Sequence, residues 1–198
     1  MRFEPLAIEG AALIAIERHP DSRGFFARTF CIDEFAAAGL PVNAVQASVS
    51  YNEHAGTVRG MHFQWPPSRE GKLVRCVRGR VRDVLLDLRP PSPTYLQHVV
   101  LTLDEDNRDA VFIPPGIAHG FQTLLPGTEV LYQMTDRFAP GLAAGVRWND
   151  PSFSISWVAM PQLTISDRDA AYPDFNRAEF ESELLRRSNF VAQPGPAS

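Results

Sequence analysis

A histidine, a lysine and a tyrosine on three separate predicted strands are the residues best suited to chemistry. His62 lies in the segment GTVRGMHFQ, Lys72 opens the next apolar run, and Tyr132 follows a Val-Leu pair. His119 follows the turn Pro115-Gly116-Ile117-Ala118. An imidazole can remove a proton near neutral pH, and an ammonium group can stabilise the negative charge that results. This set therefore favours proton transfer next to a carbonyl group, and Arg59 adds forked contacts suited to a phosphate.

His62 and His119 also resemble half of a metal site with three histidines and one carboxylate. Gln64 stands where a second histidine would be required, and glutamine is a poor metal ligand. The nearest glutamate, Glu70, follows an intervening Pro66-Pro67 pair. We therefore expect no metal.

Other cofactor and nucleophile motifs are missing from the chain. The sequence holds no GxGxxG, no P-loop and no GxSxG segment, which are needed for dinucleotide binding, phosphoryl transfer and hydrolysis by a nucleophilic serine. Ser48 and Ser50 lack an identifiable nucleophile elbow and are interpreted as strand hydroxyls. We therefore expect no cofactor.

Arg59 and His62 are three positions apart, so a regular strand would place them on opposite faces. Gly60 between them could introduce a kink that changes this. The elements that must position these groups are short and separated by turn residues, since 17 prolines and 13 glycines are spread along the chain. The predicted strands cover residues 13–18, 42–51, 58–63, 72–78, 81–88, 98–103, 110–113, 118–124 and 130–136, with one more near Ile155.

Gly79 and Arg80 predict a tight hairpin between the strands 72–78 and 81–88, whereas residues 20–24 predict a loop. A short helix is predicted over 32–38, and Asn176 predicts the start of an amphipathic C-terminal helix over 178–187. The pattern lacks βαβ alternation. We therefore expect an all-β double-stranded jelly roll with a few short helices and a cavity open at one end.

The composition bounds the remaining possibilities. The chain has 198 residues, of which 44% are hydrophobic, and this predicts a single domain over 1–190 with a mobile tail over 191–198. A net charge of −4 argues against binding to nucleic acid or to an anionic membrane surface. No apolar run is long enough for a bilayer span, and the first residues lack a secretory signal. Cys31 and Cys76 fit reduced thiols, so we expect a cytoplasmic protein.

Five segments, taken in order, resemble the dTDP-4-dehydrorhamnose 3,5-epimerase family. They are DSRGFF at 21–26, GTVRGMHFQ at 56–64, KLVRC at 72–76, IPPGIAHGF at 113–121 and GVRWNDP at 145–151. The resemblance runs from about Arg2 to about Phe175. It implies a jelly-roll homodimer that acts without metal or nicotinamide on a nucleotide-diphosphate 4-keto-6-deoxy sugar.

The resemblance also implies a role for each matching residue. His62 would be the base, Asp169 the carboxylate that orients it, Tyr132 the acid on the opposite face, and Lys72 the cation beside the C4 oxygen. Implied substrate contacts are Arg23, Phe26, Gln46, Ser48, Arg59, His119 and Arg168. Among these, Arg23 and Arg59 would contact the diphosphate, and Phe26 the nucleobase.

Three departures from the family pattern leave the substrate open. Arg28 stands where many relatives have an acidic residue, Ser48-Val49 replaces an Asn-His pair, and Arg137-Phe138 follows Asp136 where relatives often carry tyrosines. The alternatives are an epimerase of C3 alone or of C5 alone, or one acting on another nucleotide. A jelly-roll 3,4-ketoisomerase and a non-catalytic sugar-binding protein also remain.

Overall fold

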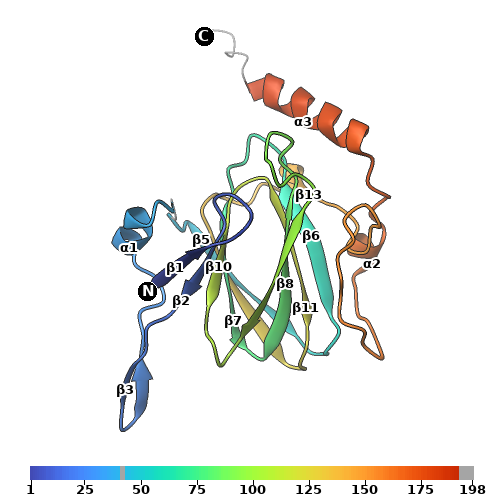
Figure 1. Cartoon of the computed structure of the whole chain (residues 1–198). Coiled ribbons are helices and arrows are strands. Elements are labelled where there is room, and N and C mark those ends of the chain that lie inside the picture. The colour runs from blue at the N-terminus through green and yellow to red at the C-terminus, as the bar shows by residue number, and fades with distance from the viewer. Residues whose placement is uncertain (41–42, 192–198) are drawn as a thin grey trace.

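Two antiparallel sheets face each other and enclose the core (Figure 1). The computed structural model describes residues 1–40 and 43–191. The first sheet has the order β1 (Arg2–Pro5), β2 (Ala12–Ala15), β10 (Ala110–Ile113), β7 (Lys72–Arg78), β12 (Thr128–Met134) and β5 (Gln46–Asn52). The second has the order β13 (Ala143–Gly145), β6 (Val58–Gln64), β11 (Ile117–Thr123), β8 (Arg80–Asp87) and β9 (His98–Asp104). The predicted jelly roll is thereby confirmed.

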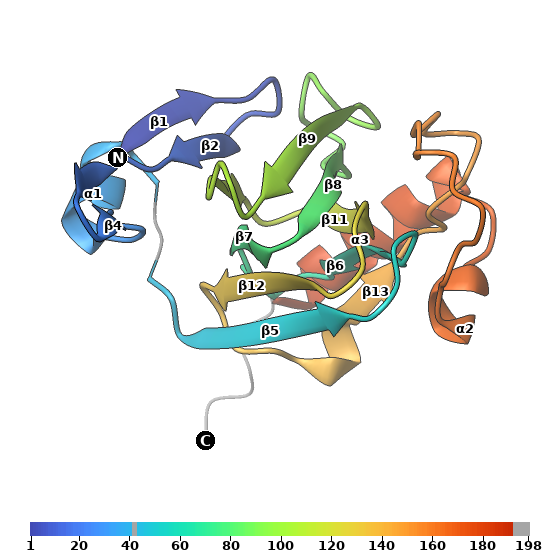
Figure 2. The ribbon, with the colours of Figure 1, turned by 90° about the horizontal axis from the view of Figure 1, so that it is seen from below.

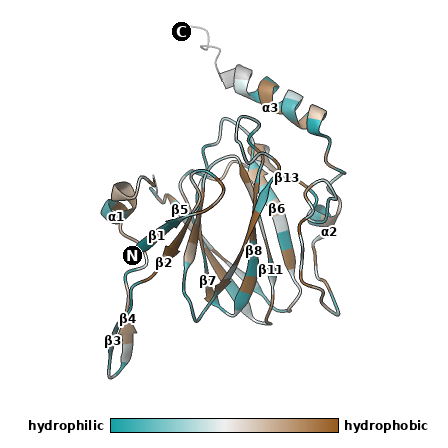
Figure 3. Ribbon diagram, viewed as in Figure 1, coloured by the Kyte–Doolittle hydropathy of each residue, from teal (hydrophilic) through white to brown (hydrophobic). Residues whose placement is uncertain are grey.

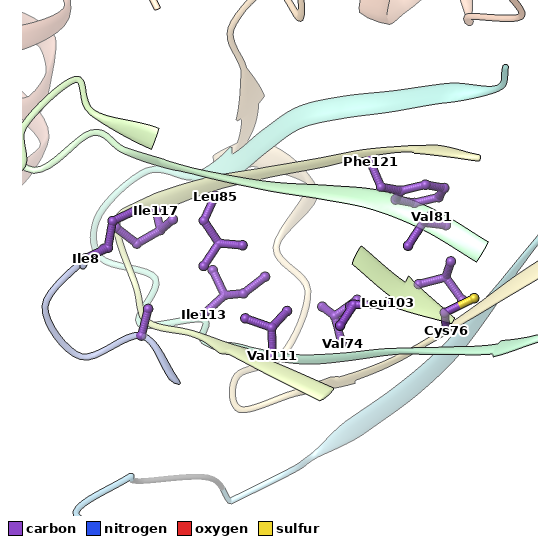
Figure 4. Packing of buried hydrophobic residues seen from close by; sticks show 12 residues of the cluster. Ile8, Val74, Cys76, Val81, Leu85, Leu103, Val111, Ile113, Ile117 and Phe121 are labelled. Atoms are coloured by element: carbon purple, nitrogen blue, oxygen red, sulfur yellow. The ribbon is translucent and has the colours of Figure 1, made fainter. Parts of the chain in front are cut away.

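Alternating side chains of the two sheets fill the space between them. Val74 and Cys76 of β7 belong to one buried cluster with Val81 and Leu85 of β8, and Phe121 of β11 lies at one end of this cluster (Figure 4). All five residues are at most 1% exposed. Burying a side chain of this size contributes roughly 1.5–3 kcal/mol, so this cluster holds the sheets at a fixed separation.

The hairpin predicted at Gly79 is wrong. Strands β7 and β8 belong to different sheets, and Gly79 is the corner at which the chain passes from one to the other. Its φ is +77°, and a Cβ there would lie 2.4 Å from Oγ1 of Thr128. The Gly79 carbonyl accepts a hydrogen bond from the amide of Glu105 and not from a facing strand. A glycine between two strands therefore marked a change of sheet.

Two further segments differ from the prediction. Residues 155–160 form no strand, because the side chain of Gln122 bonds both the N–H and the C=O of Val158 in place of a neighbouring backbone. The strand predicted over 13–18 ends at Ala15, and a hairpin of β3 (His19–Asp21) and β4 (Gly24–Phe26) replaces the predicted loop. The strand predicted over 42–51 begins at Gln46, and residue 42 lies outside the described residues.

The predicted helices are confirmed. Helix α1 (Ile32–Ala37) buries Phe35 completely, and α3 (Arg177–Val191) begins where the side chain of Asn176 accepts the amide hydrogens of Ala178 and Glu179. A short helix α2 (Asp167–Ala170) and a 3-10 turn η1 (Pro140–Leu142) complete the elements. The predicted tail over 191–198 lies outside the described residues, apart from Val191 at the end of α3.

The hydropathy of the strands reflects their place in the fold. In Figure 3, β2 is brown throughout, whereas teal bands interrupt β6 and β8. Polar residues therefore interrupt the apolar pattern on β6, which contributes to the site described below, and on β8, which lies in the same sheet. In the part of the chain that the structure describes, no helix is both long and apolar enough to cross a membrane.

Candidate active site

A cavity of about 500 Å³ opens between the two sheets. Strands β5, β7 and β12 form one wall, and β6 and β11 form the other. Eight residues singled out from the sequence line it: Gln46, Ser48, Arg59, His62, Lys72, His119, Tyr132 and Arg168. The fold thus collects groups that lie more than 100 residues apart in the chain.

Gly60 brings Arg59 and His62 into the same cavity. Its φ of +128° lies outside the range that other residues favour, and the pairing of β6 with β11 shifts register at this point. A Cβ on Gly60 would lie 2.5 Å from the Cα of Gly120. The irregularity breaks the two-residue alternation of the strand, so side chains three positions apart share one face.

A carboxylate behind His62 fixes its ring. The Nε2 atom of His62 lies 2.7 Å from Oδ1 of Asp169, and the backbone N–H of Gly60 donates to the other oxygen at 3.1 Å. Asp169 lies on α2, whose first turn is capped by the side chain of Ser166. Burial raises the pKa of Asp169, but the hydrogen bond and charge of His62 outweigh it and hold that pKa below its ordinary value. Asp169 is thus an ionised partner for His62.

A second buried carboxylate lies behind His119. Its Nε2 atom is 2.8 Å from Oδ2 of Asp83, whose side chain is wholly buried. Asp83 was not predicted as a site residue. It lies within an apolar run, and the alternation from Val81 to Leu85 places it on the inward face. An aspartate at an inward position of an apolar strand was the signal that could have found it.

Tyr132 faces His62 from the opposite sheet. It lies on β12 between Ser48 of β5 and Val74 of β7, and its ring meets that of His119 edge-on at 6.0 Å. Burial, and next the charge of Asp83, raise the pKa of Tyr132, while Arg59 opposes this weakly. The hydroxyl therefore keeps its proton at neutral pH and can donate it.

Lys72 lies at the β7 end of the cavity beside Glu70. Its ammonium nitrogen is 3.2 Å from Oε1 of Glu70, whose other oxygen accepts a hydrogen bond from Gln64 at 2.6 Å. Gln64 and Glu70, which the sequence placed near a hypothetical metal site, thus bond to each other. Within the described residues, no group of three or more histidine, cysteine, aspartate or glutamate side chains is placed to hold a metal ion.

Arg23 and Phe26 do not reach this cavity within one chain. They lie on the β3–β4 hairpin, which projects from the sheets on the side away from α2 (Figures 1 and 2). The side chain of Arg23 is 87% exposed and pairs with Asp21, and Phe26 is 72% exposed.

The departures noted in the sequence lie at different places. Arg28 pairs with Glu34 at 2.8 Å near α1, and Val49 points out of the barrel with 62% of its surface exposed. Phe138 lines the cavity, and its N–H donates to Oε1 of Gln46 at 2.6 Å. Phe138 is therefore a departure that can touch a bound molecule.

Ser50 and Met134, which were not predicted as contacts, also line the cavity.

A second hollow, of about 480 Å³, lies under α3. Its lining is mainly apolar, with Trp65, Phe180 and Leu184 on one side, and it contains no histidine or lysine. The histidines, the lysine and the tyrosine that could transfer protons line the first cavity, which is therefore the candidate active site.

A jelly roll whose cavity joins a carboxylate-backed histidine, a lysine and a tyrosine defines an acid-base enzyme of the isomerase type. The chain belongs to the dTDP-4-dehydrorhamnose 3,5-epimerase family, whose model matches residues 5–177. The epimerase of that name from Sinorhizobium fredii is 38% identical over 173 residues, covering 87% of this chain and 89% of the relative. The dTDP-4-dehydrorhamnose 3-epimerase of Streptomyces niveus is 40% identical, and the match covers 86% of this chain and 83% of the relative.

Solved structures agree with this assignment. A 3,5-epimerase from Legionella pneumophila, crystallised with dTDP-4-keto-L-rhamnose, superimposes with a TM-score of 0.85 at 31% identity. The match covers 92% of this chain and 96% of that one. The chain is therefore a carbohydrate epimerase by family, with the jelly-roll architecture of its structural relatives.

Proposed function

We propose that this enzyme inverts C3 and C5 of a dTDP-4-keto-6-deoxy-hexose. The observation that carries the proposal is the placement of His62 and Tyr132 on facing sheets of one cavity. Inversion requires that a proton leave one face of a carbon and return to the other. A base and an acid on opposite walls supply this geometry.

The C4 ketone acidifies the hydrogens at both neighbouring carbons, but not enough for an unassisted neutral base. In the proposed reaction His62, held by Asp169, removes the proton, and the electron pair moves onto the C4 oxygen to form an enolate. Lys72 stabilises that oxygen, an effect on the order of 3 kcal/mol for a well-placed donor. Tyr132 then delivers a proton to the opposite face, and the ketone is restored.

Arg59, together with Arg23 of a second copy considered below, is the proposed diphosphate contact, and Arg168 is a further proposed substrate contact. Arg59 is oriented by a hydrogen bond of 2.7 Å to Oδ1 of Asn52, and Arg168 lies on α2 next to Asp169. Gln46 and Ser48 of β5 line the same space and can bond the sugar or the base. Guanidinium groups match the oxygens of a diphosphate with two parallel hydrogen bonds.

We further propose that a second copy of the chain supplies Arg23 and Phe26, in a homodimer. The outward face of β5, the edge strand at the opposite end of its sheet from β1, exposes Val49 and Tyr51 at 62% and 56%, so it is an apolar sheet surface. Such surfaces are typical of interfaces between copies related by a two-fold axis. In this arrangement the hairpin of one protomer reaches the cavity of its partner.

The cytoplasmic location predicted from the sequence is also kept as a proposal. Cys31 and Cys76 are free thiols, which suits a reducing compartment.

The test is incubation of the chelator-treated protein with dTDP-4-keto-6-deoxyglucose in deuterated water, followed by NMR. Deuterium at both C3 and C5, with the L-sugar captured by a downstream reductase, is the expected result. Deuterium at one carbon would replace the proposal by a mono-epimerase, an activity named for the Streptomyces niveus relative. A keto isomer without inversion would indicate a ketoisomerase, and no deuterium would overturn the proposed substrate.

A further inference from the structure

Glu70 is a buried carboxylate of the cavity, and it has no role in the reaction proposed above. Its side chain is only 6% exposed, although it borders a space meant for an anionic sugar nucleotide. An ionised carboxylate in such a place is costly unless it is paired and hydrogen-bonded. We therefore expect the Glu70 carboxylate to be paired with a positively charged group of the cavity.

Both oxygens of Glu70 are engaged. Oε1 lies 3.2 Å from the Lys72 ammonium, and Oε2 accepts from the side-chain amide of Gln64 at 2.6 Å. Gln64 is held in turn, because its own oxygen accepts the backbone N–H of Ala139 at 3.2 Å. A carboxylate bound at both ends cannot rotate away from the ammonium.

The backbone around Glu70 is also anchored. The N–H of Arg69 donates to Asp136 at 3.1 Å, and the N–H of Gly71 donates to Oγ1 of Thr135 at 2.7 Å. These contacts tie both sides of Glu70 to the chain just beyond β12. The position of the carboxylate is therefore set by the barrel itself.

Lys72 is the only lysine in the chain, since the other basic side chains counted in the 19 Lys and Arg residues are all arginines. A lysine has a flexible stem and a point charge, so it has no preferred direction unless a neighbour provides one. Its side chain is only 16% exposed, and within the described residues Glu70 is its sole ion-pair partner.

We propose that Glu70 is a positioning residue that fixes the Lys72 ammonium for the enolate oxygen, through the chain from Ala139 to Gln64 to Glu70. The inference rests on the role given to Lys72 in the proposed function. Without the carboxylate, the ammonium would sample several rotamers and lose its alignment with the C4 oxygen.

The single lysine permits a direct structural test. Protein labelled with ¹³C at the lysine ε-carbon gives one signal, and a fixed side chain shows two separate shifts for its ε-hydrogens. We expect Glu70→Ala to merge them and Glu70→Gln, which keeps an acceptor oxygen, to retain part of the separation. Glu179→Gln is the matched control, because Glu179 is exposed on α3. Separate shifts in Glu70→Ala equal to those of the wild type would overturn the proposal.

The kinetic test separates positioning from binding. Glu70→Ala should lower kcat at least tenfold while the Kd for dTDP changes less than twofold, with an intermediate kcat for Glu70→Gln. An unchanged kcat, or a loss explained by weaker dTDP binding, would contradict the role of Glu70. If the wild type itself exchanges no deuterium, the proposed function fails, whereas the ε-hydrogen shifts still decide whether Glu70 fixes Lys72.

Discussion

The two histidines and the lysine of the cavity each contact a buried carboxylate. Asp169 contacts His62, Asp83 contacts His119, and Glu70 contacts Lys72. Removing a carboxylate from water costs several kcal/mol, so three such pairs are hard to explain by stability alone. In the proposed function they orient the histidines and the lysine, and the arginines of the cavity remain for the substrate.

Replacement of Asp169 by asparagine tests the first of these pairs. The amide keeps the shape of the side chain but cannot stabilise an imidazolium, so kcat should fall by about 10–100-fold. The Kd for dTDP should stay unchanged because the arginines are untouched. Steady-state kinetics and calorimetric titration measure the two quantities. A rise in the Kd without a fall in kcat would show that Asp169 serves substrate binding.

Tyr132→Phe separates proton removal from inversion. The variant keeps His62 and Lys72, so deuterium exchange at the sugar carbons should continue. It lacks the hydroxyl on the opposite sheet, so the L-sugar should no longer form. Exchange is followed by NMR in deuterated water and inversion by capture with a reductase. Retained inversion would remove Tyr132 from the role of the acid.

The sequence allowed prediction of most cavity residues but not of all their partners. His62, Lys72 and Tyr132 stand out because their types are rare in apolar strands. Asp83 was missed because its burial beside the site depends on which face of β8 points inward, and packing against the other sheet decides that. The location of Arg23 could not be derived either, since it depends on the path of the β3–β4 hairpin.

At the scale of elements, glycines decide where the sheets can meet. Gly79 is the corner between sheets, and Gly60 allows β6 to approach β11. Sequence periodicity predicted the strands around both residues well, because alternation of apolar side chains is a local signal. It could not distinguish a hairpin from a change of sheet, since pairing is a long-range property.

Gly60→Ala should damage both stability and catalysis. The new Cβ would lie 2.5 Å from the Cα of Gly120 and 2.9 Å from the carbonyl oxygen of His119, in a backbone conformation of positive φ. Strain of about 1–3 kcal/mol should lower the Tm by several degrees. Activity should fall further, because Arg59 and His62 would no longer share one face.

Gly141→Ala is the matched control for this substitution, because a Cβ at Gly141 meets no atom within 4 Å. Its Tm and kcat should equal those of the wild type. Thermal unfolding followed by circular dichroism, together with the exchange assay, measures both variants. Equal Tm values for the two substitutions would show that β6 does not depend on Gly60.

At the scale of the whole molecule, buried aspartates make the stability of the folded protein depend on pH. The carboxylates of Asp87 and Asp150 are buried, and burial raises their pKa values. Hydrogen bonds outweigh burial in both: Arg89, Ser92 and Thr94 bond Asp87, and the N–H groups of Phe175 and Ser152 bond Asp150. Both pKa values therefore lie below their ordinary range in the folded protein.

This arrangement predicts loss of stability in acid. A carboxyl whose pKa is lowered by folding stabilises the fold fully above its unfolded pKa of about 3.9, and the contribution disappears as the pH falls through the folded value. The urea concentration at the midpoint of unfolding should therefore decrease when the pH is lowered below about 4. Asp87→Asn should make this midpoint depend less on pH. A midpoint that stays constant from pH 5 to pH 3 would contradict this account.

The proposed dimer makes each active site a product of two chains, which complementation can test. Arg23→Ala and His62→Ala should each be nearly inactive alone. In a mixed dimer, one site combines an intact His62 with the intact hairpin of its partner, so coexpression should restore about a quarter of wild-type activity. Arg59 and His62 line the same cavity, so coexpression of Arg59→Ala with His62→Ala should restore none. Failure of the first pair to recover activity would mean that Arg23 does not act across an interface, and the exposed hairpin would need another explanation.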